Sequence, residues 1–299
     1  MRKVTIKTIL FVIPILSIFN LLACSDENNI SDPTHEFIYM DYYAVWSGVH
    51  NLIAYVHYQQ PDTDDLDSSG IYVIKPDGTE KQLLLRVEYT FGLDWSHDGT
   101  KLVTNIAHML ITISYSEGIV DTITQPGQYF DPSWSPDGSI IAIGDYSGSD
   151  MGIYFISDFG DNYRKKIHAG VRPVWVTNDS LIFLNGDTSF TPHAITIADT
   201  SGQNRREIYT VFSLLDTSQP KFNALKRRIV FDTYVKNEYH HSVYKLAIDS
   251  TNAELLQNEA YFPCLSPDGE KVVFTKVEGS EGRLWIINWD GTGLGQLTY

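Results

Sequence analysis

A short motif that recurs along the chain constrains its fold more than any other feature. Three clear copies contain Ser-Pro-Asp-Gly or Ser-His-Asp-Gly directly after a bulky residue, which is Trp95, Trp134 or Leu265. The centre of an apolar run follows seven positions later, and the same spacing identifies three degenerate copies at Trp46, Trp175 and Phe222. These six anchor residues are 49, 39, 41, 47 and 43 positions apart. A repeat near 44 residues favours a four-stranded antiparallel unit over a helical one.

A second recurring segment supports strands. Each copy contains a run of four to six β-branched and aromatic residues bounded by Gly, Asp or Pro, and these runs cover residues 70–74, 110–113, 153–156, 194–197, 243–246 and 284–287. Such runs predict buried strands, whereas helical periodicity and capping boxes are much weaker here. The sequence therefore predicts an all-β chain, a six-bladed β-propeller of four-stranded antiparallel blades over residues 37–299.

The turn motif itself has a structural explanation. In Ser-Pro-Asp-Gly, Pro presets φ for the second position of a type I turn, Asp tolerates the third, and Gly supplies the positive φ. The anchor residue before it supplies bulk for packing between neighbouring blades. We interpret Trp46, Trp95, Trp134, Trp175, Phe222 and Leu265 as structural residues. We reject a ring of metal ligands made of Asp98, Asp137 and Asp268, because one Asp per blade at a turn lies far from its equivalents.

The Trp-Ser-Pro-Asp-Gly hairpin at Trp134, together with Ile-Tyr-Val strands and Asp-Gly turns, resembles the TolB-like class of β-propeller repeats. The resemblance covers about residues 40–299. It implies blades at roughly 42–87, 88–126, 127–169, 170–212, 213–260 and 261–299, with borders left open by the degenerate copies. TolB also carries an α/β domain ahead of its propeller, and a short tether stands there in this chain. The resemblance therefore implies the propeller and not a Tol-Pal role.

The N-terminal segment predicts export and lipidation. Residues 1–23 hold Arg2, Lys3 and Lys7, no acid, and an apolar stretch that is shorter than the ~20 residues that span a bilayer. This segment ends in Leu-Leu-Ala-Cys24, which resembles the lipobox of bacterial lipoproteins and implies a diacylglycerol on the Cys24 thiol and labelling by palmitate. The alternative is an ordinary secretory signal peptide.

Residues 24–36 are polar and acidic and predict a flexible tether. Acidic residues just after Cys24 resemble the surface-export signal of Bacteroidota lipoproteins. A solubilising linker on a periplasm-facing lipoprotein is the alternative. The sequence thus predicts a lipid-anchored protein of the bacterial cell envelope, in the outer membrane, on either its periplasmic or its surface face.

Charge and cysteine content exclude two classes. The chain has 22 Lys and Arg against 37 Asp and Glu, and its net charge of −15 becomes −18 once residues 1–23 are removed. An acidic surface argues against a nucleic-acid partner, because phosphates require a basic one. Two cysteines cannot make a disulfide scaffold. We expect a monomer.

Two loops are candidates for ligand or ion binding. The first contains Asp62, Asp64, Asp65 and Asp67 and begins like an EF-hand loop at Asp65, but its twelfth position is Pro76 instead of an acid. The alternatives are a solvated acidic loop and a weak Ca²⁺ site; no other cofactor is expected. The second loop contains Tyr239, His240 and His241 and is a candidate for recognition. Neighbouring imidazoles on a strand point to opposite faces and would not share a metal.

The sequence favours a non-catalytic recognition module that binds a protein, peptide or glycan. Variable connections between second and third strands, together with the central channel, are the expected binding surface. No Gly-x-Ser-x-Gly elbow is present, and Cys264 falls in an expected buried strand. Oligogalacturonate lyases have similar repeats and a His-bound metal, so the alternative is a metal-assisted polysaccharide lyase or hydrolase at the channel. The histidines here are scattered over the blades and identify no metal site.

Overall fold

The computed structural model describes residues 39–59, 69–145, 152–157, 170–185, 193–211, 217–235 and 240–299, without the side chains of His193 and Val235. Every described residue belongs to one compact unit, Thr34–Tyr299. The predicted export signal, Cys24 and the predicted tether lie outside the described residues. The part of the chain that the structure describes contains strands only, so it holds no helix that could cross a membrane.

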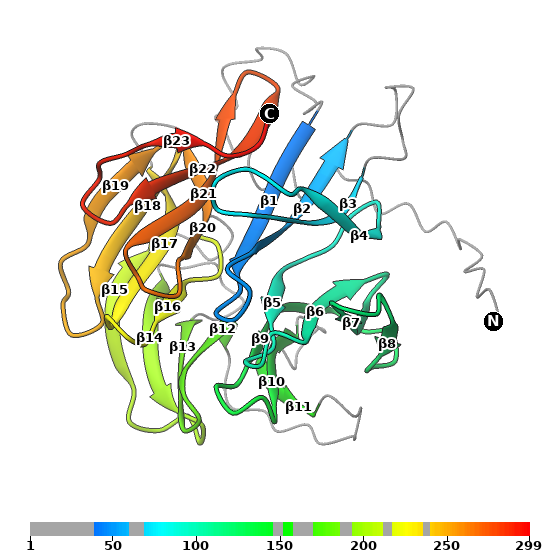
Figure 1. The fold of residues 1–299 in the computed structure, drawn as a ribbon. Helices are drawn as coiled ribbons and strands as arrows, with labels where there is room; N and C mark the ends of the chain where they lie inside the picture. The colour runs from blue at the N-terminus through cyan, green and yellow to red at the C-terminus, as the bar shows by residue number, and fades with distance from the viewer. Residues whose placement is uncertain are drawn as a thin grey trace, which may run out of the picture. The chain divides into compact units, whose positions relative to one another are not determined.

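The described strands form five hydrogen-bonded sheets, which comprise six consecutive antiparallel groups (Figure 1). The first three groups are β1 (Tyr39–Trp46), β2 (Ile53–Gln59), β3 (Gly70–Ile74) and β4 (Gln82–Arg86); β5 (Leu93–Trp95), β6 (Lys101–Ile106), β7 (Met109–Ser114) and β8 (Val120–Thr122); and β9 (Tyr129–Trp134), β10 (Ile141–Asp145) and β11 (Gly152–Ile156). The last three are β12 (Gly170–Thr177), β13 (Ser180–Asn185), β14 (His193–Asp199) and β15 (Arg206–Val211); β16 (Lys221–Asn223), β17 (Arg228–Val235), β18 (His240–Ala247) and β19 (Glu254–Asn258); and β20 (Ala260–Leu265), β21 (Lys271–Glu278), β22 (Glu281–Asn288) and β23 (Gly295–Gln296). One sheet joins the first and last of the six groups through the pairing of β1 with β22. The prediction of an all-β chain with four-stranded antiparallel sheets is confirmed.

The first strand of each group carries the anchor residue at or near its end. Five anchors pair directly with the apolar residue seven positions later, as in Trp95 with Leu102 and Trp134 with Ile141. In the fourth copy Trp175 pairs with Leu181, one position earlier, because only two residues separate Thr177 from Ser180 in that hairpin. The spacing in the sequence therefore reports strand register, apart from this one shortened turn.

The hydrophobic core consists of six clusters, and each lies between two neighbouring groups of strands. Every anchor packs in the cluster that its own group shares with the preceding group. Trp95, for example, packs with Val45 and Val56 of the first group, and Trp46 packs against the cluster shared with the sixth. The first strands contact one another in the order β1, β5, β9, β12, β16, β20 and again β1. The clusters and the first strands thus form a closed ring.

The junction between the first and last groups contains a buried carboxylate. Asp41 on β1 is fully buried, and its Oδ1 lies 2.6 Å from Nδ1 of His57. Its Oδ2 accepts a hydrogen bond from the hydroxyl of Thr298 and lies 4.0 Å from Nη1 of Arg283, while its main-chain oxygen accepts from Thr275 at 2.7 Å. β1 also pairs in parallel with β22. A single acidic side chain therefore joins both ends of the ring.

The Ser-Pro-Asp-Gly hairpins repeat one hydrogen-bond pattern. In the third group the Ser135 hydroxyl donates to Asp137 Oδ1 at 2.6 Å, which also accepts from the amide of Ser139 at 3.0 Å. The amide of Gly138, whose φ is +72°, donates to the Ser135 oxygen at 2.9 Å. The turns at Asp98 and Asp268 have the same bonds. These donors hold the pKa of each Asp below its ordinary value.

Candidate functional site

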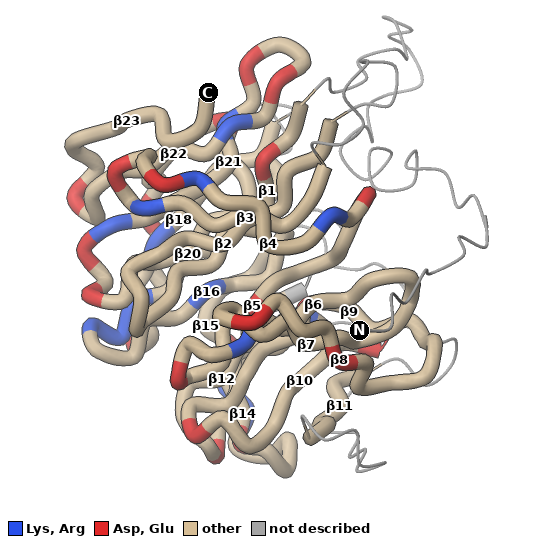
Figure 2. The backbone as a smooth tube through the Cα atoms, turned by 45° about the vertical axis from the view of Figure 1, so that its right-hand side comes forward, with Lys and Arg blue, Asp and Glu red and all other residues tan. Residues whose placement is uncertain are grey.

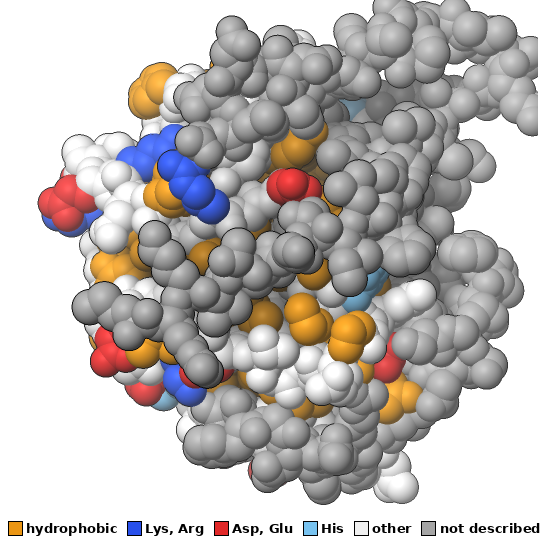
Figure 3. Space-filling view, turned by 90° about the vertical axis from the view of Figure 1, so that its right-hand side faces the viewer, with side chains coloured by type: hydrophobic (Ala, Val, Ile, Leu, Met, Phe, Trp, Pro, Cys, Tyr) orange, Lys and Arg blue, Asp and Glu red, His pale blue; other side chains and the backbone are white. Residues whose placement is uncertain are grey.

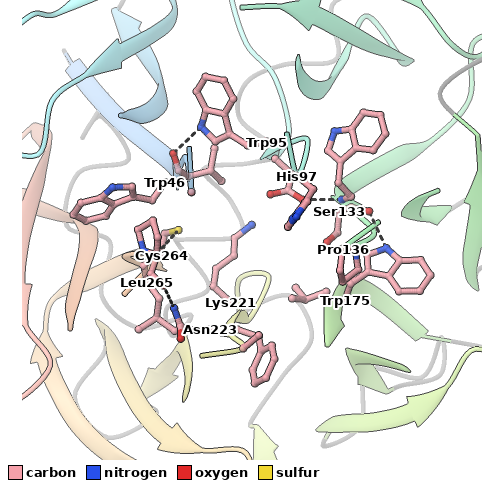
Figure 4. Close-up of a pocket in the computed structure, with 18 of the residues that line it drawn as sticks. Trp46, Trp95, His97, Ser133, Pro136, Trp175, Lys221, Asn223, Cys264 and Leu265 are labelled. Carbon is pink, nitrogen blue, oxygen red and sulfur yellow. Dashed lines mark hydrogen bonds between the residues drawn. The ribbon is translucent and has the colours of Figure 1, made fainter. Parts of the chain in front are cut away.

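A cavity of about 260 Å³ lies where the ends of the six first strands converge (Figure 4). Its wall includes all six anchors and also the residue directly before each anchor. We call this second set the channel ring; it consists of Val45, Asp94, Ser133, Val174, Lys221 and Cys264. Because side chains alternate along a strand, an anchor that packs sideways between blades leaves the preceding residue facing the channel. The first hairpin turns, including Gly48, His97, Pro136 and Ala224, form the rim.

Lys221 extends into the middle of this cavity (Figure 4). Its ammonium donates to the side-chain oxygen of Gln219, which is only 5% exposed. The amide nitrogen of Gln219 in turn donates to the main-chain oxygens of Asp131 at 3.0 Å and Pro173 at 2.7 Å. Gln219 therefore links three neighbouring groups of strands and fixes the direction of the cation.

Asp94 is the acidic member of the channel ring. Its Oδ2 accepts from the amide of Trp134 at 2.7 Å, and the Ser133 hydroxyl also donates to it. Burial raises the pKa of the Asp94 carboxyl to about 6, although Lys221 and these donors favour the charged form. Asp94 on β5 and Lys221 on β16 are three steps apart in either direction around the ring of first strands. The two residues therefore enter the channel from opposite sides.

The Lys221 ammonium also affects the pKa of two further groups, the Cys264 thiol and the Asp131 carboxyl. Burial raises the pKa of the Cys264 thiol, an effect that Lys221 reduces without reversing. The thiol is therefore protonated near neutral pH and is a poor nucleophile. Burial also raises the pKa of Asp131, which forms an ion pair with Arg172 at 3.6 Å. Elsewhere in the described part of the chain, acidic residues are spread over several segments of the backbone (Figure 2).

Below the channel ring, the first strands share a backbone distortion. The residue three positions before the anchor has a positive φ in five groups: Tyr43 (52°), Gly92 (77°), Asp131 (50°), Arg172 (58°) and Phe262 (51°). Register shifts mark bulges at this level, for example between Tyr42 and Val45. A left-handed non-glycine residue costs roughly 1–2 kcal/mol, so the fold maintains this distortion against a local preference.

Aromatic side chains gather near these bulges. The rings of Tyr43 and Phe262 lie 4.7 Å apart, and both contact Tyr42. Tyr43 and Phe262 also line a smaller cavity of about 10 Å³ together with Gln219 and Lys221. Figure 3 shows hydrophobic side chains on one face of the described part of the chain. The ring thus combines polar and apolar residues, and aromatic side chains line the smaller cavity.

Some residues of the two predicted binding loops lie outside the described part of the chain, and the others lie on a strand. Tyr239, Asp62, Asp64, Asp65 and Asp67 lie outside the described residues. His240 and His241 lie on β18 and not in the preceding loop, which corrects the assignment of these two residues to a recognition loop. Because the strand pleat alternates, His240 contacts the Ser242 hydroxyl at 3.2 Å, whereas His241 turns inward.

His241 is 6% exposed, and its Nδ1 lies 3.0 Å from Oδ2 of Asp232. Its ring lies 4.8 Å from that of Tyr261. Its Nε2 has no hydrogen-bond partner among the described residues. Within the same residues, no three His, Cys, Asp or Glu side chains come close enough together to hold a metal ion.

The cavity of about 260 Å³ opens among the first hairpin turns, whereas we expected binding at the connections between second and third strands as well as in the channel. Most of those connections lie outside the described residues.

Sequence reasoning also missed the channel ring. Its members share a position but no chemistry, so a search for repeated residues passes over them. Their signal was positional: each directly precedes an anchor.

Comparison with known proteins agrees with the architecture. The sequence matches no family model and no curated protein. The structure is similar to TolB from Acinetobacter baumannii (TM-score 0.69, 19% identity, 81% of this chain and 62% of that one). It is also similar to a putative TolB from Agrobacterium tumefaciens (TM-score 0.61, 18% identity, 73% and 84% of the two chains). An oligogalacturonate lyase in complex with manganese has a TM-score of 0.54 at 11% identity, with 87% and 77% covered. The chain has a TolB-like β-propeller fold and spans 62% of the A. baumannii protein.

Proposed function

We propose that this protein is a non-catalytic recognition module of the bacterial cell envelope, anchored by a lipid on Cys24, that binds its partner through the propeller channel. The partner is a protein, a peptide or a glycan. The observation that carries the proposal is the contrast within the first strands: repeated anchors build the scaffold, and the channel ring beside them presents five different residue types from its six positions. Variable side chains on a rigid scaffold are the usual arrangement of a binding site.

The rim offers a way to test the channel with a matched control. Ala224 lines the cavity mouth, whereas Leu225 is 73% exposed and does not line it. We expect Ala224→Trp to obstruct the mouth and Leu225→Trp to leave it open. The experiment is chemical cross-linking of the full chain in its native envelope, followed by immunoprecipitation. A partner recovered with the wild type and Leu225→Trp but lost with Ala224→Trp supports the proposal. Equal recovery with all three removes the channel as the site.

The proposed lipid attachment at Cys24 has its own test. Cys24→Ala should abolish labelling by palmitate and release the protein from the membrane fraction. Labelling that persists in this variant contradicts lipidation at Cys24. The likeness to the manganese-containing lyase is the observation that favours the alternative, a metal-assisted polysaccharide lyase or hydrolase. Manganese-dependent cleavage of oligogalacturonate by the wild type, at a rate that Ala224→Trp reduces, would replace the recognition proposal with this enzymatic one.

A further inference from the structure

The channel ring contains one acid and one base that face each other without pairing. Asp94 and Lys221 occupy opposite sides of the ring, and among the residues that the structure describes neither forms an ion pair. Lys221 donates to a neutral amide oxygen, and Asp94 accepts from an amide and a hydroxyl. Enclosed charges are normally paired, because removing them from water is costly. Lys221 favours the charged form of Asp94 without direct contact, and an acid and a base that line one cavity without touching point to a ligand that contacts both.

We propose that the channel cavity binds a small zwitterion, with its ammonium group on Asp94 and its carboxylate on Lys221. The ligand class is a free α-amino acid or a dipeptide. At about 260 Å³ the cavity is just below the ~300–1,000 Å³ of pockets for drug-sized molecules, which suits a ligand of this size. The inference rests on the proposed function, since it names the ligand chemistry of the same channel.

The orientation of the charged groups is fixed before a ligand arrives. Gln219 is tied to two neighbouring blades and holds Lys221, while the Trp134 amide and the Ser133 hydroxyl hold Asp94. Groups that are already oriented lose less conformational entropy on binding. Val45 and Val174 supply apolar wall between the charges and favour an aliphatic side chain on the ligand.

Binding should depend on pH through Asp94. Its pKa of about 6 means that the carboxylate form predominates above that value and the neutral form below it. The other titratable groups around the cavity are Lys221 on β16, Cys264 on β20, and His97 on the rim, with Asp131 on β9 also coupled to Lys221. An ammonium ligand should therefore bind more weakly as the pH falls from ~7.5 to ~5.

Intrinsic tryptophan fluorescence provides the readout, because Trp46, Trp95, Trp134 and Trp175 line the cavity. The full chain in detergent is titrated with a panel of free α-amino acids and a panel of dipeptides. The best ligand is then compared with its amide, which lacks the carboxylate, and with its deaminated acid, which lacks the ammonium. We expect each analogue to bind ~10- to 100-fold more weakly, as loss of one charged hydrogen bond predicts. The two panels distinguish a single amino acid from a dipeptide.

Two variants and two matched controls complete the test. Asp94→Asn and Lys221→Met should each weaken binding ~10-fold or more. Asp121→Asn and Lys271→Met, at exposed positions outside the cavity, should not change it. The ligand analogues need only the wild type, so the test holds even where a variant fails to fold.

Either of two outcomes overturns the inference: no amino acid or dipeptide binds at up to ~10 mM, or the deaminated acid binds as tightly as its parent, which would make the site one for simple anions. If this happens while Ala224→Trp still abolishes capture of an envelope partner, the recognition proposal stands and only the zwitterion is excluded. If capture also proves insensitive to Ala224→Trp, both proposals fail.

Discussion

Neighbouring residues at the ends of the first strands differ sharply in what they do. Each anchor packs between two blades and repeats in kind, with Trp in four of the six copies. Each channel-ring residue stands one position earlier, lines the cavity, and differs from blade to blade except for the two valines, although Val45 and Cys264 also pack in clusters between blades. The comparison teaches that repetition within a chain marks its scaffold, and that the irregular position beside it is where binding specificity can reside.

The largest expected effect of a substitution is at an anchor. Trp175 stacks on Phe155 with ring centres 5.1 Å apart and donates to the oxygen of Ser133. Trp175→Ala should lower the free energy of unfolding by about 3–5 kcal/mol through the cavity it leaves. The channel-ring variant Lys221→Met should cost less than about 1 kcal/mol. Urea unfolding of both measures the difference, and similar losses in the two variants would erase the distinction between anchor and ring.

The junction between the first and last groups should be next in sensitivity, because it relies on a charge. Asp41→Asn keeps the shape but removes the carboxylate that His57 and Thr298 contact. We expect unfolding free energy to fall by about 2–4 kcal/mol, the range for breaking a buried charged network. Thermal unfolding checks this against the exposed Asp121→Asn. A melting temperature unchanged in Asp41→Asn would show that packing alone closes the ring.

In the channel ring, replacing Asp94 should raise the free energy of unfolding instead of lowering it. The folded-state pKa of Asp94 is about 6, above its ordinary value of 3.8, so the wild type loses stability as the pH rises through that interval. Asp94→Asn should therefore be more stable than the wild type at pH ~7.5, by about 1–3 kcal/mol, and about equal at pH ~4. Unfolding measured across this pH range provides the check. A variant that is less stable at neutral pH would mean that Asp94 serves the scaffold.

The smallest expected effect is at a hairpin turn. Asp137→Ala removes hydrogen bonds from Ser135 and Ser139 at the exposed end of one blade and should cost about 1 kcal/mol. The pKa of Asp137 lies below its ordinary value, so its contribution is present near neutral pH and disappears as the pH falls through the folded-state pKa. Chemical unfolding at pH ~7 and at pH ~2.5 should show the deficit only at the higher pH. A deficit of equal size at both values would assign the effect to something other than the carboxylate.

The sequence predicted the scaffold well because register and turn chemistry are local. The interval of seven from Trp46 to Ile53 and from Leu265 to Val272 corresponds to real cross-strand pairs. The bulges were not predicted, since Tyr43, Arg172 and Phe262 are not residue types that favour a positive φ. A clue was present in Pro132, Pro173 and Pro263, each directly after a bulge residue, because proline inside a strand is largely confined to edges and bulges.

The candidate site was harder to predict, because it depends on which blades face each other. Asp94 and Lys221 are 127 positions apart, and nothing in either local sequence relates them. Only closure of the ring places β5 opposite β16. For His241 the local sequence gave the wrong prediction. Its neighbours suggested an exposed loop, whereas His241 lies on β18 and is buried against Asp232 of the adjacent strand.

The six clusters between blades have a consequence for how the protein unfolds. An open array of repeats can fray from its ends, because a terminal repeat has only one neighbour. Here each cluster is shared by two groups of strands, and the set closes through Asp41, so no group is terminal. Opening any blade exposes two apolar surfaces at once. Amide protons on the first strands of all six groups should therefore exchange with solvent at similar rates, in a single cooperative event.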